Sequence, residues 1–135
     1  MTTVKRDVLV HAEPATVWDA VRDVGALHTR LAPGVVTATE MEPPGAVMVR
    51  HVTFSSGLRL RERIVDIDDD ERRLVWSIEG EGVVHHNGSL QVSRAGPGQT
   101  KVVWIADVLP HALATDFAPL MEAGLAAMAA HLSKG

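Results

Sequence analysis

The sequence predicts an α+β fold in which a seven-stranded antiparallel sheet wraps around a long C-terminal helix. Three observations predict it. The chain begins with a strand-like segment and two short helical segments, continues with six short alternating runs, and ends on a long apolar stripe at helical spacing. Because the separators between the runs are too short to contain crossover helices, neighbouring runs are expected to pair antiparallel. The final helix is the segment that can cover the apolar face of such a sheet.

The first three elements follow from periodicity and turn residues. Residues 4–12 read as a strand, with valines recurring at even spacing. Residues 13–24 read as a helix, because Pro14 suits a first turn and an apolar stripe containing Trp18 follows it. Residues 25–31 predict a second short helix, which the sequence Ala-Pro-Gly ends.

The middle of the chain alternates with period two, and its end returns to helical spacing. The last helix is predicted over residues 115–134, capped by Thr115 or Asp116, with Pro119 in or near the first turn. The separators of the middle region are rich in Pro, Gly, Ser and Asp, as turns are. The six predicted strands cover residues 35–41, 46–54, 58–67, 73–78, 88–93 and 100–108.

Length and composition restrict the possible functions. The 135 residues predict a single domain over residues 1–135, and 46% of them are hydrophobic. The net charge is −4, no basic run occurs and only five residues are aromatic, which argues against nucleic-acid binding. The absence of cysteine excludes thiolate catalysis. With no apolar run near 18 to 20 residues and no signal-peptide core at the start, we expect no membrane insertion and a cytoplasmic location.

No metal or cofactor site is predicted. None of the seven histidines is paired at i, i+4 on a predicted helix, and the adjacent His85 and His86 would face opposite sides of a strand. The acidic turn at residues 66–71 has Glu71 where a calcium-binding loop needs glycine, so we expect a solvated hairpin turn. One of the two adjacent histidines is expected to act as a hydrogen-bonding group at the mouth of a pocket.

Glu62 is the residue that points to a site. In the run of residues 58–67, period two places Leu58, Leu60, Glu62 and Ile64 on one face and three arginines on the other. If the apolar face is buried, the strand carries a carboxylate into the interior. An unpaired buried charge is costly, so this carboxylate predicts either a partner or a functional site.

Several motifs resemble the START-like (SRPBCC) superfamily, which includes polyketide cyclase/dehydrase-like proteins. Its opening is similar to the segment "HAEPATVWDAVRDVGALH". The gate region of the plant abscisic acid receptors, members of the superfamily, is similar to "VRHVTFSSGL", and the strand pair that follows is similar to "ERIVDIDDDERRLVWSI". Their latch is matched loosely by "VHHNG". The resemblance covers nearly the whole chain.

The resemblance implies the helix-grip fold, with a deep cavity between the sheet and the C-terminal helix. It also implies that Glu62 faces this cavity, together with Arg50, Val52, Phe54 and the gate residue Leu58. The lysine that pairs with the hormone in the receptors has no counterpart in the stretch "PGVVTAT". Hormone recognition and the phosphatase partner of the receptors are therefore not expected here.

The leading hypothesis is the binding of an apolar or amphipathic small molecule, such as a lipid, polyketide or aromatic metabolite, in an internal cavity. The alternative is a polyketide cyclase or dehydratase that uses Glu62 with His86 or Arg50 as acid/base groups. A third hypothesis is an interaction or co-chaperone module with a collapsed cavity. The protein is expected to be a monomer or homodimer. The predicted ligand-binding residues are Leu27, Leu31, Arg50, Val52, Phe54, Leu58, Glu62, Trp76, His86, Trp104, Met121, Leu125 and Met128.

Overall fold

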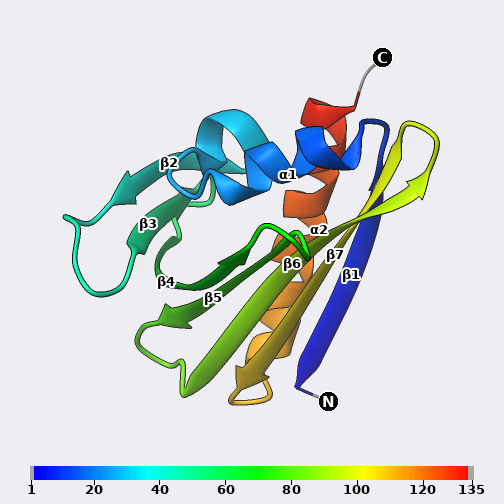
Figure 1. The fold of residues 1–135 in the computed structure, drawn as a ribbon. Helices are drawn as coiled ribbons and strands as arrows, with labels where there is room; N and C mark the ends of the chain where they lie inside the picture. Colours follow the sequence, from blue (N-terminus) through cyan, green and yellow to red (C-terminus); the bar gives the residue numbers. More distant parts are fainter. Residues whose placement is uncertain (1, 134–135) are drawn as a thin grey trace.

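A computed structural model describes residues 2–133 of the chain (Figure 1). The chain begins with one strand and two short helical segments, continues with six strands, and ends with a long helix. The elements are β1 (Thr3–Val10), α1 (Pro14–Arg22), η1 (Leu27–Leu31), β2 (Val36–Met41), β3 (Val49–Phe54), β4 (Arg59–Asp68), β5 (Arg73–Glu79), β6 (His85–Gly96), β7 (Gln99–Leu109) and α2 (Leu113–Leu132).

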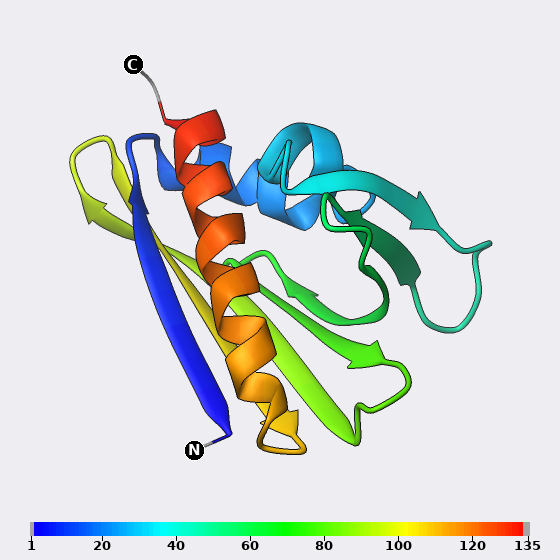
Figure 2. The same cartoon turned by 180° about the vertical axis from the view of Figure 1, so that it is seen from behind.

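The seven strands form one sheet in the order β1-β7-β6-β5-β4-β3-β2, and every neighbouring pair is antiparallel. Helix α2 lies across one face of this curved sheet, while α1 and η1 lie together near one end of it (Figures 1 and 2). The predicted α+β helix-grip architecture is confirmed. It creates an inner sheet face toward α2 and an outer face toward solvent.

Helix α2 supplies the apolar side of the core. Its buried residues recur at helical spacing along one stripe and include Phe117, Met121 and Met128. The helix begins at Leu113, earlier than predicted, so Pro119 lies inside the helix rather than in its first turn. Residue 134, where the helix was predicted to end, lies outside the described residues. Among residues 2–133, no helix is both long and apolar enough to cross a membrane.

Two local features differ from regular periodicity. The predicted second short helix is a single π-helical turn, in which the backbone N–H of Ala32 donates to the carbonyl of Leu27 over 2.9 Å. Strand β4 contains a register shift between Ile64 and Asp66. Because this shift lies beyond Glu62, it leaves the inward direction of the carboxylate unchanged.

The acidic β4–β5 turn is hydrogen-bonded to helix α1. Asp69 accepts hydrogen bonds from the indole Nε1 of Trp18 at 2.9 Å and from Nε of Arg22 at 2.8 Å. The Arg22 guanidinium, followed by the Trp18 hydrogen bond, lowers the pKa of Asp69. Asp68 accepts the backbone N–H groups of Asp70 and Glu71 within the turn. The turn therefore fastens the sheet to α1, a contact that the sequence did not predict.

Candidate functional site: an internal cavity

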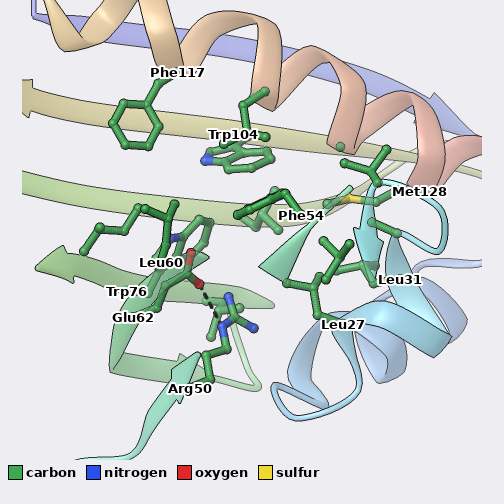
Figure 3. Close-up of a pocket in the computed structure, with 18 of the residues that line it drawn as sticks. Leu27, Leu31, Arg50, Phe54, Leu60, Glu62, Trp76, Trp104, Phe117 and Met128 are labelled. Atoms are coloured by element: carbon green, nitrogen blue, oxygen red, sulfur yellow. Dashed lines mark hydrogen bonds and ion pairs between the residues drawn. The ribbon is translucent and has the colours of Figure 1, made fainter. Parts of the chain in front are cut away.

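The candidate site is a cavity between α2, η1 and the inner face of strands β3 to β7 (Figure 3). Its free volume is about 40 Å³, enough for only a few water molecules. Its wall is mostly apolar, with a small number of polar side chains. The lining residues are Leu27, Leu31, Ala32, Val35, Val36, Arg50, Phe54, Leu60, Glu62, Leu74, Trp76, Ile78, His86, Leu90, Trp104, Phe117, Leu120, Gly124 and Met128.

An ion pair is buried at one side of the cavity. Arg50 on β3 and Glu62 on β4 are directly opposite in the strand register, and Nε of Arg50 donates to Oε1 of Glu62 over 2.8 Å. The two side chains are 4% and 6% exposed. Nη1 of Arg50 also donates to the carbonyl of Val24 over 3.2 Å, and the guanidinium lies 5.8 Å from the ring centre of Trp76. The arginine is thus held from three directions, of which Figure 3 shows Glu62 and Trp76.

The carboxyl group of Glu62 experiences two opposing influences. Burial raises its pKa, whereas the positive charge and hydrogen bond of Arg50 oppose that change. Among residues 2–133, only Oε1 of this carboxyl is hydrogen-bonded to a side chain, through Arg50. Oε2 is left available to a molecule in the cavity, as an acceptor when the group is ionised and as a donor when it is protonated.

His86 on β6 contributes a second polar group. Its Nδ1 accepts the backbone N–H of Ile78 over 3.1 Å, so a neutral ring carries its proton on Nε2. Burial, and to a smaller extent the neighbouring His85, lowers the pKa of His86 to about 4. The ring lies beside Phe117 of α2, with 5.3 Å between the ring centres. At neutral pH His86 is therefore an uncharged hydrogen-bond donor.

Two glycines allow the aromatic wall to assemble. The rings of Trp76 and Trp104 meet edge to face, with centres 5.6 Å apart. A Cβ atom on Gly88 would lie 2.9 Å from Cε2 of Trp76, and one on Gly124 would lie 3.1 Å from Cζ3 of Trp104. A side chain at Gly88 would force a neighbour such as Trp76 to shift, and one at Gly124 would require Trp104 to give by a few tenths of an ångström.

The structure brings most of the predicted residues to the cavity. They come from η1, from the five strands β3 to β7 and from α2, segments that are distant in sequence (Figure 3). Gly88 on β6 and Gly124 on α2, which let the two indoles lie close, were not predicted. The predicted residues that line the cavity are Leu27, Leu31, Arg50, Phe54, Glu62, Trp76, His86, Trp104 and Met128.

Four of the predicted ligand-binding residues do not line the cavity. Leu58 is 45% exposed and does not line the cavity, because it precedes β4 and follows Gly57, whose φ of 92° turns the backbone out of the strand pattern. Val52, Met121 and Leu125 point inward but are buried in the packed core away from the cavity. The periodicity of the sequence correctly predicted that these three residues face inward. It could not predict which inward-facing residues border the cavity.

Other lining residues were not predicted. Leu60 shares the face of Glu62, and Phe117 and Leu120 belong to the apolar stripe of α2, so their signals were present in the sequence. Gly88 and Gly124 had no local signal, because their role depends on tryptophans from other elements. Across residues 2–133, no three His, Asp or Glu side chains gather in an arrangement that could hold a metal ion.

Comparison with known proteins agrees with this architecture. The sequence matches the family described as "Polyketide cyclase / dehydrase and lipid transport" over residues 1–133. The chain belongs to this family. The assignment confirms the resemblance to the SRPBCC group of polyketide cyclase-like proteins. No curated protein matches this polyketide cyclase / dehydrase family member at a significant level.

Several solved structures resemble the family member over most of its length. The protein XoxI from Bacillus cereus is 20% identical with a TM-score of 0.83, covering 98% of this chain and 96% of its own. A Thermobifida fusca protein is 29% identical with a TM-score of 0.71, covering 93% and 85%. The Zhui aromatase/cyclase from Streptomyces sp. R1128 is 17% identical with a TM-score of 0.76, covering 95% and 91%. These likenesses concern the fold.

Proposed function

We propose that this protein binds an apolar or amphipathic small molecule, such as a lipid, polyketide or aromatic metabolite, in the cavity beneath α2. The observation that carries the proposal is an interior wall that is largely apolar but contains a few polar groups from different strands. This combination is typical of small-molecule sites, where apolar walls supply affinity and polar groups fix orientation. The family description, which includes lipid transport, supports the same class of ligand.

Ligand entry requires the cavity to widen. Its free volume of about 40 Å³ is far below the roughly 300 Å³ at which ligand pockets begin. Met128 and several leucines line the space, and flexible side chains of this kind can change rotamer without leaving the core. The cavity is therefore too small for such a ligand in this structure, and binding requires the side chains of its wall to move.

The hydrogen bonds that already engage the polar groups of the cavity favour ligand binding over catalysis. Glu62 is engaged by Arg50, and Nδ1 of His86 is occupied by a backbone N–H. A His86 with a pKa of about 4 is also a weak base at neutral pH. These groups are therefore suited to hold and orient a ligand.

A cyclase or dehydratase is the second candidate, and the raised pKa of Glu62 is the observation that favours it. Protonated Glu62 could donate from Oε2 to a substrate oxygen, with His86 or Arg50 as the second group. Turnover of a β-keto thioester model substrate by the wild type, abolished in Glu62→Gln without loss of binding, would establish this function. Binding without turnover would leave the cavity as a carrier site.

The proposal is tested by a matched pair of substitutions on β4. Leu60→Trp places a large ring at the cavity, whereas Val65→Trp adds the same ring to the outer face, where Val65 is 59% exposed. Melting is measured for each protein with a panel of fatty acids, aromatic ketones and polycyclic phenols. A true ligand at 100 times its Kd stabilises the wild type by about 2.7 kcal/mol.

The stabilisation should persist in Val65→Trp and disappear in Leu60→Trp. If no member of the panel stabilises the wild type, or if both variants respond like the wild type, binding in this cavity is disproved. Circular dichroism of both variants without ligand confirms that each has folded before binding is compared.

A further inference from the structure

The indole N–H of Trp104 is a buried hydrogen-bond donor in the cavity wall. Its Nε1 atom is inaccessible to solvent and has no acceptor among the described residues. Trp104 itself lines the cavity, opposite the buried ion pair, and its nitrogen edge is turned toward the side where Phe117 lies (Figure 3). Buried polar groups in folded proteins are nearly always hydrogen-bonded, so an exception in the wall of a cavity calls for a partner.

The indole N–H of Trp18, by contrast, has a hydrogen-bond acceptor. Nε1 of Trp18 donates to Asp69 over 2.9 Å, and Trp18 does not line the cavity. The other buried polar side chains of the cavity each have at least one protein partner, since Arg50 pairs with Oε1 of Glu62 and Nδ1 of His86 accepts from Ile78. Nδ1 of His28 and Oγ1 of Thr39 are also buried without a partner among the described residues, but neither residue lines the cavity, whereas Trp104 does.

The position of Trp104 is fixed by its neighbours. Gly124 admits the six-membered ring of the indole close to α2, because any Cβ there would lie 3.1 Å from Cζ3. Trp76 packs against the indole at an interplanar angle of 61°. The ring therefore cannot easily rotate to bring Nε1 to solvent, and the donor is held in place before a ligand arrives.

We propose that the Trp104 N–H is the polar anchor of the ligand and donates a hydrogen bond to a carbonyl or hydroxyl oxygen. This inference rests on the proposed binding function. It narrows the ligand class to oxygenated apolar molecules and excludes plain hydrocarbons as the best fit. When a ligand widens the cavity and places an oxygen near Nε1, the unpaired N–H gains a hydrogen bond. A hydrocarbon in the same place leaves this donor unpaired.

The test uses two probes of nearly the same shape. 2-Acetylnaphthalene has a carbonyl where 2-isopropenylnaphthalene has a CH₂ group, so only the ketone can accept from Trp104. Calorimetric Kd values are measured for both probes with the wild type and with Trp104→Phe, which removes the N–H and retains an aromatic ring. We expect the substitution to weaken ketone binding about tenfold more than hydrocarbon binding.

A nuclear magnetic resonance measurement keeps the test independent of the variant. The protein has three tryptophans, so three indole N–H signals are expected. The ketone should shift the Trp104 N–H signal downfield, the hydrocarbon should not, and the Trp18 signal should stay unchanged because its N–H is already bound to Asp69.

The outcomes separate the two proposals. If the wild type binds both probes but Trp104→Phe weakens them equally and no downfield shift appears, the anchor role is disproved and cavity binding stands. If neither probe nor any compound of the melting panel binds the wild type, the binding function fails and the anchor role fails with it.

Discussion

Strands β3 and β4 carry ion pairs on both faces, and the two faces behave differently. On the inner face, Arg50 and Glu62 form one isolated pair enclosed by the cavity and the core. On the outer face, one residue along each strand, charged side chains form a connected network in which the partners are 24% to 48% exposed. Its members are Glu42, His51, Arg61, Arg63 and Glu79.

The two faces move carboxyl pKa values in opposite directions. On the outer face, hydrogen bonds from Arg61 and His51 lower the pKa of Glu42 to about 2. On the inner face, burial raises the pKa of Glu62 although an arginine touches it. The same pairing chemistry therefore forms a solvated network outside the sheet and an enclosed polar pair inside it.

The largest effect is expected for Glu62→Gln. The substitution preserves the size of the side chain but leaves the Arg50 guanidinium buried without a counter-charge, which should lower the free energy of unfolding by about 3–5 kcal/mol. Urea denaturation at pH 7 measures the change. A loss below about 1 kcal/mol would show that Arg50 reaches solvent or another anion, and would contradict the enclosed pair.

A pH-dependent effect of about 3 kcal/mol is expected from His86. Its pKa is about 4 in the folded protein against a usual 6.5, so between these values the unfolded chain binds more protons. Stability should therefore fall as the pH drops from 6.5 to 4, through this group. Since Glu42 and Glu62 also titrate in acid, the measured quantity is the difference between the wild type and His86→Gln.

The adjacent histidine supplies the control for that measurement. His85 is exposed and is only the smaller cause of the low pKa of His86, so His85→Gln should keep most of the wild-type pH dependence of unfolding between pH 4 and 6.5. Equal slopes for His86→Gln and the wild type would mean that the His86 ring is protonated as readily in the folded protein as in the unfolded chain.

A smaller loss, about 1–3 kcal/mol, is expected for Gly88→Ala. The new Cβ would lie 2.9 Å from Cε2 of Trp76 and 3.0 Å from Cε1 of His86, so the inner face must rearrange. Gly80→Ala is the matched control, because a Cβ there meets no atom within 4 Å. Thermal unfolding and near-ultraviolet circular dichroism should change for Gly88→Ala alone, and a silent Gly88→Ala would refute the tight packing of Trp76.

The smallest effect is expected on the outer face. Glu79 pairs with Arg61 at 2.9 Å and with Arg63 at 2.7 Å, but all three side chains are exposed enough for solvent to screen the charges. Glu79→Gln should cost about 1 kcal/mol or less, and the loss should shrink in 1 M NaCl. A loss as large as that of Glu62→Gln would remove the distinction between the two faces.

The contrast also explains which parts of the structure could be predicted. Period two placed Glu62 on the inner face, since a strand has only two sides and the shift in β4 comes after it. The same period failed at Leu58, which lies before the strand begins. Alternation is reliable only within the hydrogen-bonded strand.

The partner and surroundings of Glu62 required three-dimensional information. Arg50 could be suspected as a partner, but its bond to the Val24 carbonyl depends on the loop after α1. Met121 and Leu125 occupy the predicted face of α2, yet the space lies over Leu120, Gly124 and Met128. Helical periodicity does not show where along a buried face the packing leaves free volume.

Nuclear Overhauser contacts between bound 2-acetylnaphthalene and assigned methyl groups would show directly whether the inner face encloses a ligand. We expect contacts to the methyl groups of Leu60 and Met128, which line the cavity, and none to Val65 on the outer face of β4. Contacts confined to exposed apolar residues such as Val65 or Val84, with none to Leu60 and Met128, would contradict this expectation.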